Sequence, residues 1–165
     1  MRLNLGCGRY PAPDWVNIDA WDAVGPDLVA DVARPGGLLP IAGASAQAVY
    51  AGHLFEHIAP DAVPVALAEI RRVLAPGGRF AAVGPDVDRI DPLIYPDLHR
   101  DASTGPARQG DNPHGPHLWD CTEKRMLDYI QAIFPGARAV PIADLDLFWP
   151  AVSRVWWQCA VEVTL

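Results

Sequence analysis

Short apolar runs that stop at glycine or at an acidic residue dominate the chain, and they predict β-strands. These runs cover residues 3–5, 15–19, 27–31, 48–51, 79–83, 137–142 and 156–165. The last run alternates, so that every second residue from Trp157 to Leu165 is apolar and shares one face. Early strands joined by short loops, then a strand–helix–strand unit and a closing pair, predict an α/β domain with a mostly parallel sheet.

Two segments have the apolar spacing of amphipathic helices. The first is expected to begin at Asp61 as its N-cap and to end at Gly77-Gly78. It carries Ala66, Leu67, Ile70, Val73 and Leu74 on one side. The second is expected to begin with a capping box formed by Asp120 and Glu123. Its apolar side holds Met126, Leu127, Ile130, Ile133 and Phe134.

The stretch between the fifth strand and the second helix is long, rich in Pro, Asp, Gly and His, and has little periodicity. A loop of this length inside a compact domain is usually functional or disordered. We expect residues 86–119 to form a lid or substrate loop at the carboxyl end of the sheet, within one domain that spans residues 1–165.

The turn Gly6-Cys7-Gly8 after the first strand resembles the start of a dinucleotide-binding loop, but it departs from that fingerprint. The fingerprint needs a third glycine, a following helix and an acid about 20 residues on. Pro11 stands where the third glycine should be, no helix fits before Trp15, and Asp19 comes too early. A diphosphate would be poorly held, so NAD or FAD is not favoured. A nucleoside without a diphosphate, such as S-adenosylmethionine (SAM), fits a bare turn beside one carboxylate.

Four segments carry a family resemblance: LNLGCG, VNID, VYAGHLFEHI and EIRRVLAPGGRFAAVGPD, all within residues 3–86. In this order they resemble the successive motifs of class I SAM-dependent methyltransferases, and most closely the small bacterial type that begins at the first strand. The resemblance implies a Rossmann-like, seven-stranded sheet with an antiparallel last strand, flanking helices and a shortened first βα unit. It also implies transfer of the methyl group of SAM to an acceptor.

The resemblance also implies which residues bind SAM. Gly6 and Gly8 would face the methionine part, and Asp19 would bind the ribose hydroxyls. Asp31 would lie near the adenine amino group, with Val32 beside the ring. Gly52 and His53 would flank the methionine end. The full expected set is Leu5, Gly6, Cys7, Gly8, Asp19, Asp31, Val32, Gly52 and His53.

Candidates for a general base come from the long loop and its flanks: His114, His117 and Asp86. His114-x-x-His117, with His99 nearby, could instead hold a metal. His53 to His57 also spells H-x-x-E-H, the inverted zinc-peptidase motif. That motif needs a long helix, whereas residues 48–52 read as strand and turn, so we assign no metal ligand.

Composition narrows the partners. The net charge of the 165 residues is −7, and the sequence has no basic stripe. These features favour a small-molecule acceptor over a nucleic-acid substrate. No apolar run is long enough to span a bilayer, and no signal pattern starts the chain. Three scattered cysteines predict a reducing cytoplasm. The oligomeric state cannot be read from the sequence. A rival hypothesis is a non-catalytic protein that binds SAM or its demethylated product with a degenerate methyltransferase fold. The shortened first loop and Gln47, which stands before the fourth strand where the family usually has Asp, leave room for it.

Overall fold

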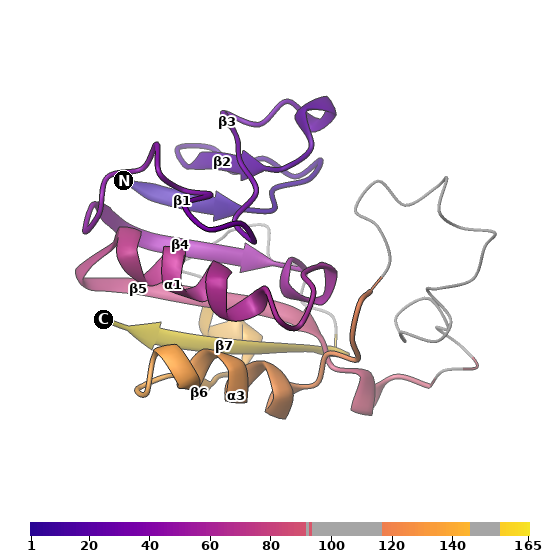
Figure 1. Ribbon diagram of the computed structural model, residues 1–165. Coiled ribbons are helices and arrows are strands. Elements are labelled where there is room, and N and C mark those ends of the chain that lie inside the picture. The colour runs from indigo at the N-terminus through magenta and orange to yellow at the C-terminus, as the bar shows by residue number, and fades with distance from the viewer. Residues whose placement is uncertain (92, 94–116, 146–155) are drawn as a thin grey trace.

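The computed structural model describes residues 1–91, 93, 117–145 and 156–165. Its strands form one seven-stranded sheet in the order β3-β2-β1-β4-β5-β7-β6 (Figure 1). The strands are β1 Arg2–Leu5, β2 Val16–Asp19, β3 Leu28–Val29, β4 Ala46–Gly52, β5 Leu74–Pro85, β6 Arg138–Ala139 and β7 Gln158–Thr164. Strands β1 to β5 pair in parallel, whereas β7 runs antiparallel to β5 and β6. The predicted fold class is confirmed.

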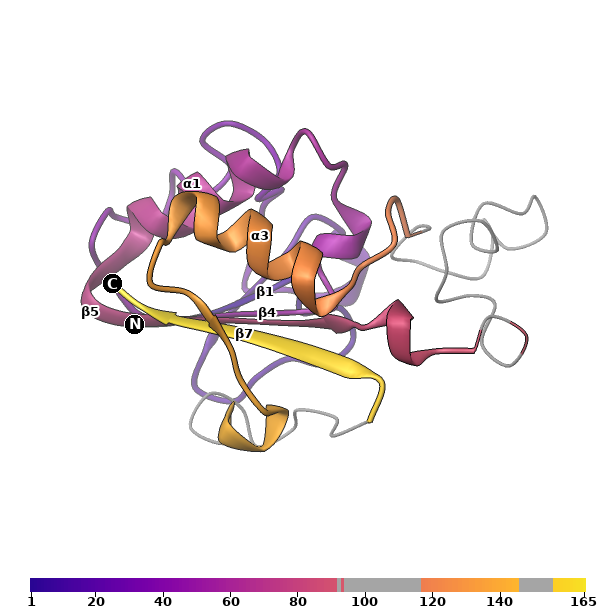
Figure 2. The same ribbon diagram turned by 90° about the horizontal axis from the view of Figure 1, so that it is seen from below.

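The helices α1 (Val63–Val73) and α3 (Glu123–Ile133) cover the same face of the sheet (Figure 2). On α1 the buried side is the predicted apolar stripe, including Leu67 and Ile70, and on α3 Met126 and Ile130 are buried. These side chains join Leu3, Val49, Phe80 and other strand residues in the main apolar core. Burial of this face holds both helices on the sheet.

Both helices begin differently from the prediction. The N-cap of α1 is Ala62, and no side-chain cap bond forms, so Asp61 was wrongly predicted as the cap. On α3 the hydroxyl of Thr122 accepts a hydrogen bond from the Arg125 N–H at 3.1 Å, so Thr122 and not Asp120 is the cap. The Thr122 hydroxyl, two positions after Asp120, accepts the N-cap hydrogen bond that was predicted for the Asp120 carboxylate.

The end of α1 also lies earlier than predicted. Leu74 is already extended (φ −68°, ψ 128°), and β5 begins at that residue, before Gly77-Gly78. The Gly77 N–H donates to the Leu165 carbonyl and the Leu165 N–H donates to the Gly78 carbonyl. The two glycines therefore belong to the strand and its pairing with the chain end, and not to a helix stop.

Only loops and a short helix cover the opposite face of the sheet within the described residues. The β1–β2 connection contains turns and no helix, and it contributes Ala12 and Trp15 to a second apolar cluster. The 3-10 helix η5 (Ile142–Leu145) contributes Leu145 and lies on this side (Figure 2). The predicted shortening of the first βα unit is therefore present.

Two predicted strands are much shorter in the structure. Only Leu28–Val29 remains of the third, since the Asp27 carboxylate accepts hydrogen bonds from the Asn17 backbone and side chain and so lies outside the ladder. Only Arg138–Ala139 remains of the sixth, because the chain passes through Pro141 into η5. The alternation of the last strand holds for Cys159, Val161 and Val163, which share the main core, whereas Ala160 lies in the second cluster.

The expected lid over residues 86–119 lies mainly in residues 92 and 94–116, outside the described part, and stays a prediction. Its first residues form the 3-10 helix η3 (Val87–Arg89). No helix in the described ranges is both long and apolar enough to cross a membrane.

Candidate cofactor site

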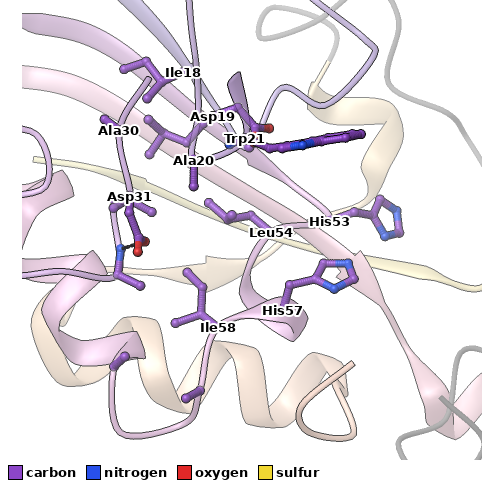
Figure 3. A pocket seen from close by; sticks show the side chains of 16 residues that line it. Ile18, Asp19, Ala20, Trp21, Ala30, Asp31, His53, Leu54, His57 and Ile58 are labelled. Carbon is purple, nitrogen blue, oxygen red and sulfur yellow. Dashed lines mark hydrogen bonds between the residues drawn. The ribbon is translucent and has the colours of Figure 1, made fainter. Parts of the chain in front are cut away.

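A cavity of about 450 Å³ opens at the carboxyl ends of the parallel strands (Figure 3). Ligands of open α/β sheets bind at this edge, and the volume lies within the usual range for ligand pockets. The cavity brings together six of the residues predicted to bind a cofactor: Leu5, Gly6, Asp19, Asp31, Val32 and His53. Cys7, Gly8 and Gly52 do not line it.

The glycine turn fits tightly at the floor of this cavity. Gly6 and Gly8 both have positive φ, 63° and 51°, a conformation that glycine adopts without strain. A Cβ atom on Gly6 would lie 2.8 Å from Cδ1 of Leu54, which also lines the cavity. The Gly8 N–H donates to Oδ2 of Asp19 at 2.8 Å, so the turn is fastened to the end of β2.

Asp19 is the buried acid of the site, with 8% of its surface exposed. Its Oδ2 accepts from Gly8, and its Oδ1 accepts from the Trp21 N–H at 2.9 Å. Each carboxylate oxygen has a second lone pair, so the group can still accept hydrogen bonds from two ligand hydroxyls. The carboxylate is held in one orientation by its backbone donors and is therefore suited to a ribose.

Asp31 stands at the other side of the cavity, just beyond β3, with Val32 buried beside it. Its Oδ1 accepts from the Ala33 N–H at 3.0 Å, and its Oδ2 pairs with Nε of Arg34 at 2.9 Å. The Asp31 carboxylate therefore stabilises its own turn. In the predicted contact with adenine, it would accept a hydrogen bond from the amino group through a lone pair that neither Ala33 nor Arg34 uses.

Two residues predicted for the cofactor have structural positions instead of lining the cavity. Cys7 is buried, and its burial together with the charge of Asp19 raises the pKa of its thiol to about 11. A nucleophilic role is thus disfavoured. A Cβ on Gly52 would lie 2.6 Å from Oη of Tyr50, so this glycine leaves room for the tyrosine ring.

His53 and His57 lie together at one end of the cavity, whereas Asp31 lies at the other (Figure 3). The His53 backbone has a positive φ of 52°, which is unusual for a residue with a Cβ and is found at functional sites. Its Nδ1 lies 2.9 Å from Oε1 of Glu56, and its Nε2 lies 2.6 Å from Nε2 of Gln158.

Glu56 is completely buried behind this end of the cavity. Burial alone would raise its pKa, but the hydrogen bond from His53 and the charges of His53 and His57 outweigh burial and lower the pKa. Residues Phe55–His57 form a 3-10 helix, η2, and not the long helix that an H-x-x-E-H peptidase needs. The zinc-peptidase alternative is therefore wrong.

The structure separates the candidates for a general base. His117 is buried, and its ring centroid lies 4.9 Å from that of His57, so it adjoins the cavity. Asp86 is also buried, but it pairs with Nε of Arg89 at 2.8 Å and does not line the cavity. Asp86 thus ties the segment after β5 together. His114 lies outside the described residues.

The cavity wall also contains apolar residues that were not predicted from the sequence, among them Trp21, Leu54 and Ile58. The indole of Trp21 extends toward His53 and His57, and Leu54 and Ile58 lie between the histidines and Asp31 (Figure 3). Leu54 lies within the H-x-x-E-H segment and Ile58 directly follows it. An apolar wall beside a few polar groups is the usual composition of a small-molecule or cofactor pocket.

Residues 16–82, about two-fifths of the chain, match the family model described as a methyltransferase domain. No curated protein matches the chain.

Solved structures show the same fold. A SAM-dependent methyltransferase from Archaeoglobus fulgidus aligns with a TM-score of 0.67 at 11% identity, over 99% of this chain and 85% of that one. A SAM-dependent methyltransferase from Mesorhizobium loti aligns with a TM-score of 0.59 at 15% identity, over 99% and 90%. A structure described as PigF with SAH aligns with a TM-score of 0.56 at 18% identity, over 98% and 54%. The sequence match covers residues 16–82, and the solved structures show that the chain has the fold of SAM-dependent methyltransferases.

Proposed function

We propose that this chain transfers the methyl group of SAM to a small-molecule acceptor, with the cofactor in the cavity between Asp31 and His57. The observation that carries the proposal is the position of Asp19. Its buried carboxylate is fixed by two backbone donors at the end of β2 and lines the cavity beside the bare Gly6. This arrangement suits an adenosine without phosphates.

The residues present fit SAM better than a dinucleotide. The segment after Gly8 forms turns instead of a helix, so no helix N-terminus is available there to receive a diphosphate. The cavity wall is mostly apolar, which suits an adenine ring, and its acids face the ligand at two separate places. We assign ribose binding to Asp19 and adenine contacts to Asp31 and Val32.

When bound, SAM supplies a methyl group on a positive sulfur that a nucleophile can take by in-line displacement, leaving a neutral thioether. The residues of the chain then have mainly to align donor and acceptor, an effect worth up to about 7–11 kcal/mol in well-oriented systems. His53 and His57 lie at the end of the cavity opposite the proposed adenine contact. We therefore place the acceptor at that end.

A base is needed only where the acceptor must lose a proton. Of the candidates, His117 is favoured by its contact with His57, whereas Asp86 is occupied by Arg89. His114 stays a candidate from the sequence. The acidic net charge of −7 supports an acceptor that is not a nucleic acid.

Thermal unfolding with SAM, with its demethylated product S-adenosylhomocysteine (SAH) and with NAD, measured in parallel, tests the proposal. A ligand at about 100 times its dissociation constant adds ~2.7 kcal/mol of stability. We expect stabilisation by the first two only. Stabilisation by NAD alone would contradict the proposal. Methyl transfer over a panel of small acceptors then separates an enzyme from a protein that only binds SAM.

A further inference from the structure

A second group of chemically competent side chains lies beside the cofactor cavity. One carboxylate oxygen of Glu56 and one ring nitrogen each of His57 and His117 lie within 4.8 Å of one another. Two imidazoles and one carboxylate form a common donor set for divalent transition metals. Around a cation with bonds of ~2.1 Å, neighbouring donors lie roughly 3.0–3.4 Å apart, so the three side chains need to close by only about 1.5 Å.

The buried carboxylate of Glu56 is the observation that points to a ligand. Glu56 has no exposed surface, and its Oε2 has no hydrogen-bond partner among the described residues. A buried carboxylate oxygen without a partner costs free energy. Its other oxygen, Oε1, is held by Nδ1 of His53. A neighbour that orients a ligating carboxylate in this way is typical of metal sites.

The backbone fixes the three side chains relative to one another. The Leu118 N–H donates to the Glu56 carbonyl at 2.7 Å. The indole N–H of Trp119 lies 2.9 Å from the Phe55 carbonyl and 3.1 Å from the Ile58 carbonyl. The segment that carries His117 is thus attached along the whole of η2, which carries Glu56 and His57. Sites built on such a braced scaffold keep their geometry.

We propose that Glu56, His57 and His117 bind one divalent transition-metal cation, such as Mn²⁺, Fe²⁺, Co²⁺ or Zn²⁺. Three protein ligands leave open positions, as catalytic metal sites do. His57 also lines the cofactor cavity, so the cation lies at the end where we place the methyl acceptor; that part rests on the proposed function. With the cation bound, His117 is a ligand and does not act as the general base.

Titration of the tag-free full chain, stripped with EDTA and then freed of EDTA, tests the site. Mn²⁺ binding is measured by calorimetry and Co²⁺ binding by its visible absorption bands, which report the donor set. We expect one cation per chain. Glu56→Gln and His117→Gln should each weaken Mn²⁺ binding at least tenfold, which is about 1.4 kcal/mol. Glu162→Gln, which removes another buried carboxylate far along the sequence, should bind as the parent does.

No saturable binding up to about 1 mM Mn²⁺, or equal affinity in parent and both variants, would overturn the proposal. The unfolding temperature of each metal-free variant checks that it folds, and His57→Gln replaces Glu56→Gln if the latter does not. SAH affinity measured in EDTA is a separate readout of the cofactor cavity. Retained SAH binding without metal binding refutes the cation site alone.

Discussion

Asp19 braces the glycine turn and, in the proposed function, also binds the ribose, so its substitution should affect both. In Asp19→Asn one acceptor oxygen is lost from a group that braces Gly8 and Trp21 and faces the cavity. A hydrogen bond to a charged group is worth about 1.5–3 kcal/mol, so SAH affinity should fall roughly 10- to 150-fold. Calorimetric titration with SAH measures this fall.

The control is Asp22→Asn, an exposed acid three residues further on that does not line the cavity. It should bind SAH as the parent does and change stability by no more than about 0.5 kcal/mol. Unchanged SAH affinity in Asp19→Asn would refute the assignment of the ribose to this residue.

Gly6 and Gly77 provide a matched pair for the glycine turn. Both have positive φ, 63° and 75°, so alanine at either site should cost about 1–2 kcal/mol of backbone strain. Only at Gly6 would the added Cβ meet a neighbour, Cδ1 of Leu54. Gly6→Ala should therefore also weaken SAH binding, whereas Gly77→Ala should not. Denaturant unfolding and SAH titration of both variants check this, and equal SAH affinities would contradict it.

The thiol of Cys7 should be unreactive in the folded chain. Burial and Asp19 raise its pKa to about 11 from the ordinary 9.0, so at pH 8 the thiolate fraction is roughly a hundredfold lower. Because the thiol ionises more readily in the unfolded chain, the free energy of unfolding decreases as the pH rises above 9.0. The decrease is complete near pH 11, where the folded chain also ionises. Rates of alkylation by iodoacetamide, followed by mass spectrometry at Cys7, measure the effect. A native rate equal to that in denaturant would contradict it.

At the scale of single elements, the N-cap of α3 is the clearest test of local structure. Thr122→Ala removes the acceptor of the Arg125 N–H and should cost about 0.5–2 kcal/mol, whereas Thr122→Ser keeps the hydroxyl and should cost less. Urea unfolding of the two variants measures the difference. Equal losses would show that the methyl group of Thr122, and not its hydroxyl, stabilises the helix.

Element prediction succeeded where one signal dominated and failed where two competed. The apolar stripe of α1 identified its buried face, because burial against the sheet decides it. Its end was misplaced, since Gly77-Gly78 resembles a helix stop while pairing with Leu165 draws the chain into β5 from Leu74 onward. Leu165 is so distant from Gly77 in the sequence that no local pattern reveals this pairing.

At the scale of the whole molecule, the cofactor cavity was predictable and the histidine cluster was not. Gly6, Asp19 and Asp31 each lie at or just beyond the carboxyl end of a parallel strand, so their convergence follows from topology alone. His117 is distant from His57 in the sequence. Their ring contact depends on the hydrogen bonds that Leu118 and Trp119 donate to η2 and its flank. His57 belongs to the H-x-x-E-H segment and His117 to the His114-x-x-His117 pair, so no sequence motif joins these two residues.

The most direct test of this account is a crystal structure of the chain with SAH. We expect the adenosine in the cavity, with both ribose hydroxyls within hydrogen-bond distance of the Asp19 carboxylate and the adenine beside Val32 and Asp31. SAH bound elsewhere on the chain, or in the cavity with its ribose away from Asp19, would contradict the account.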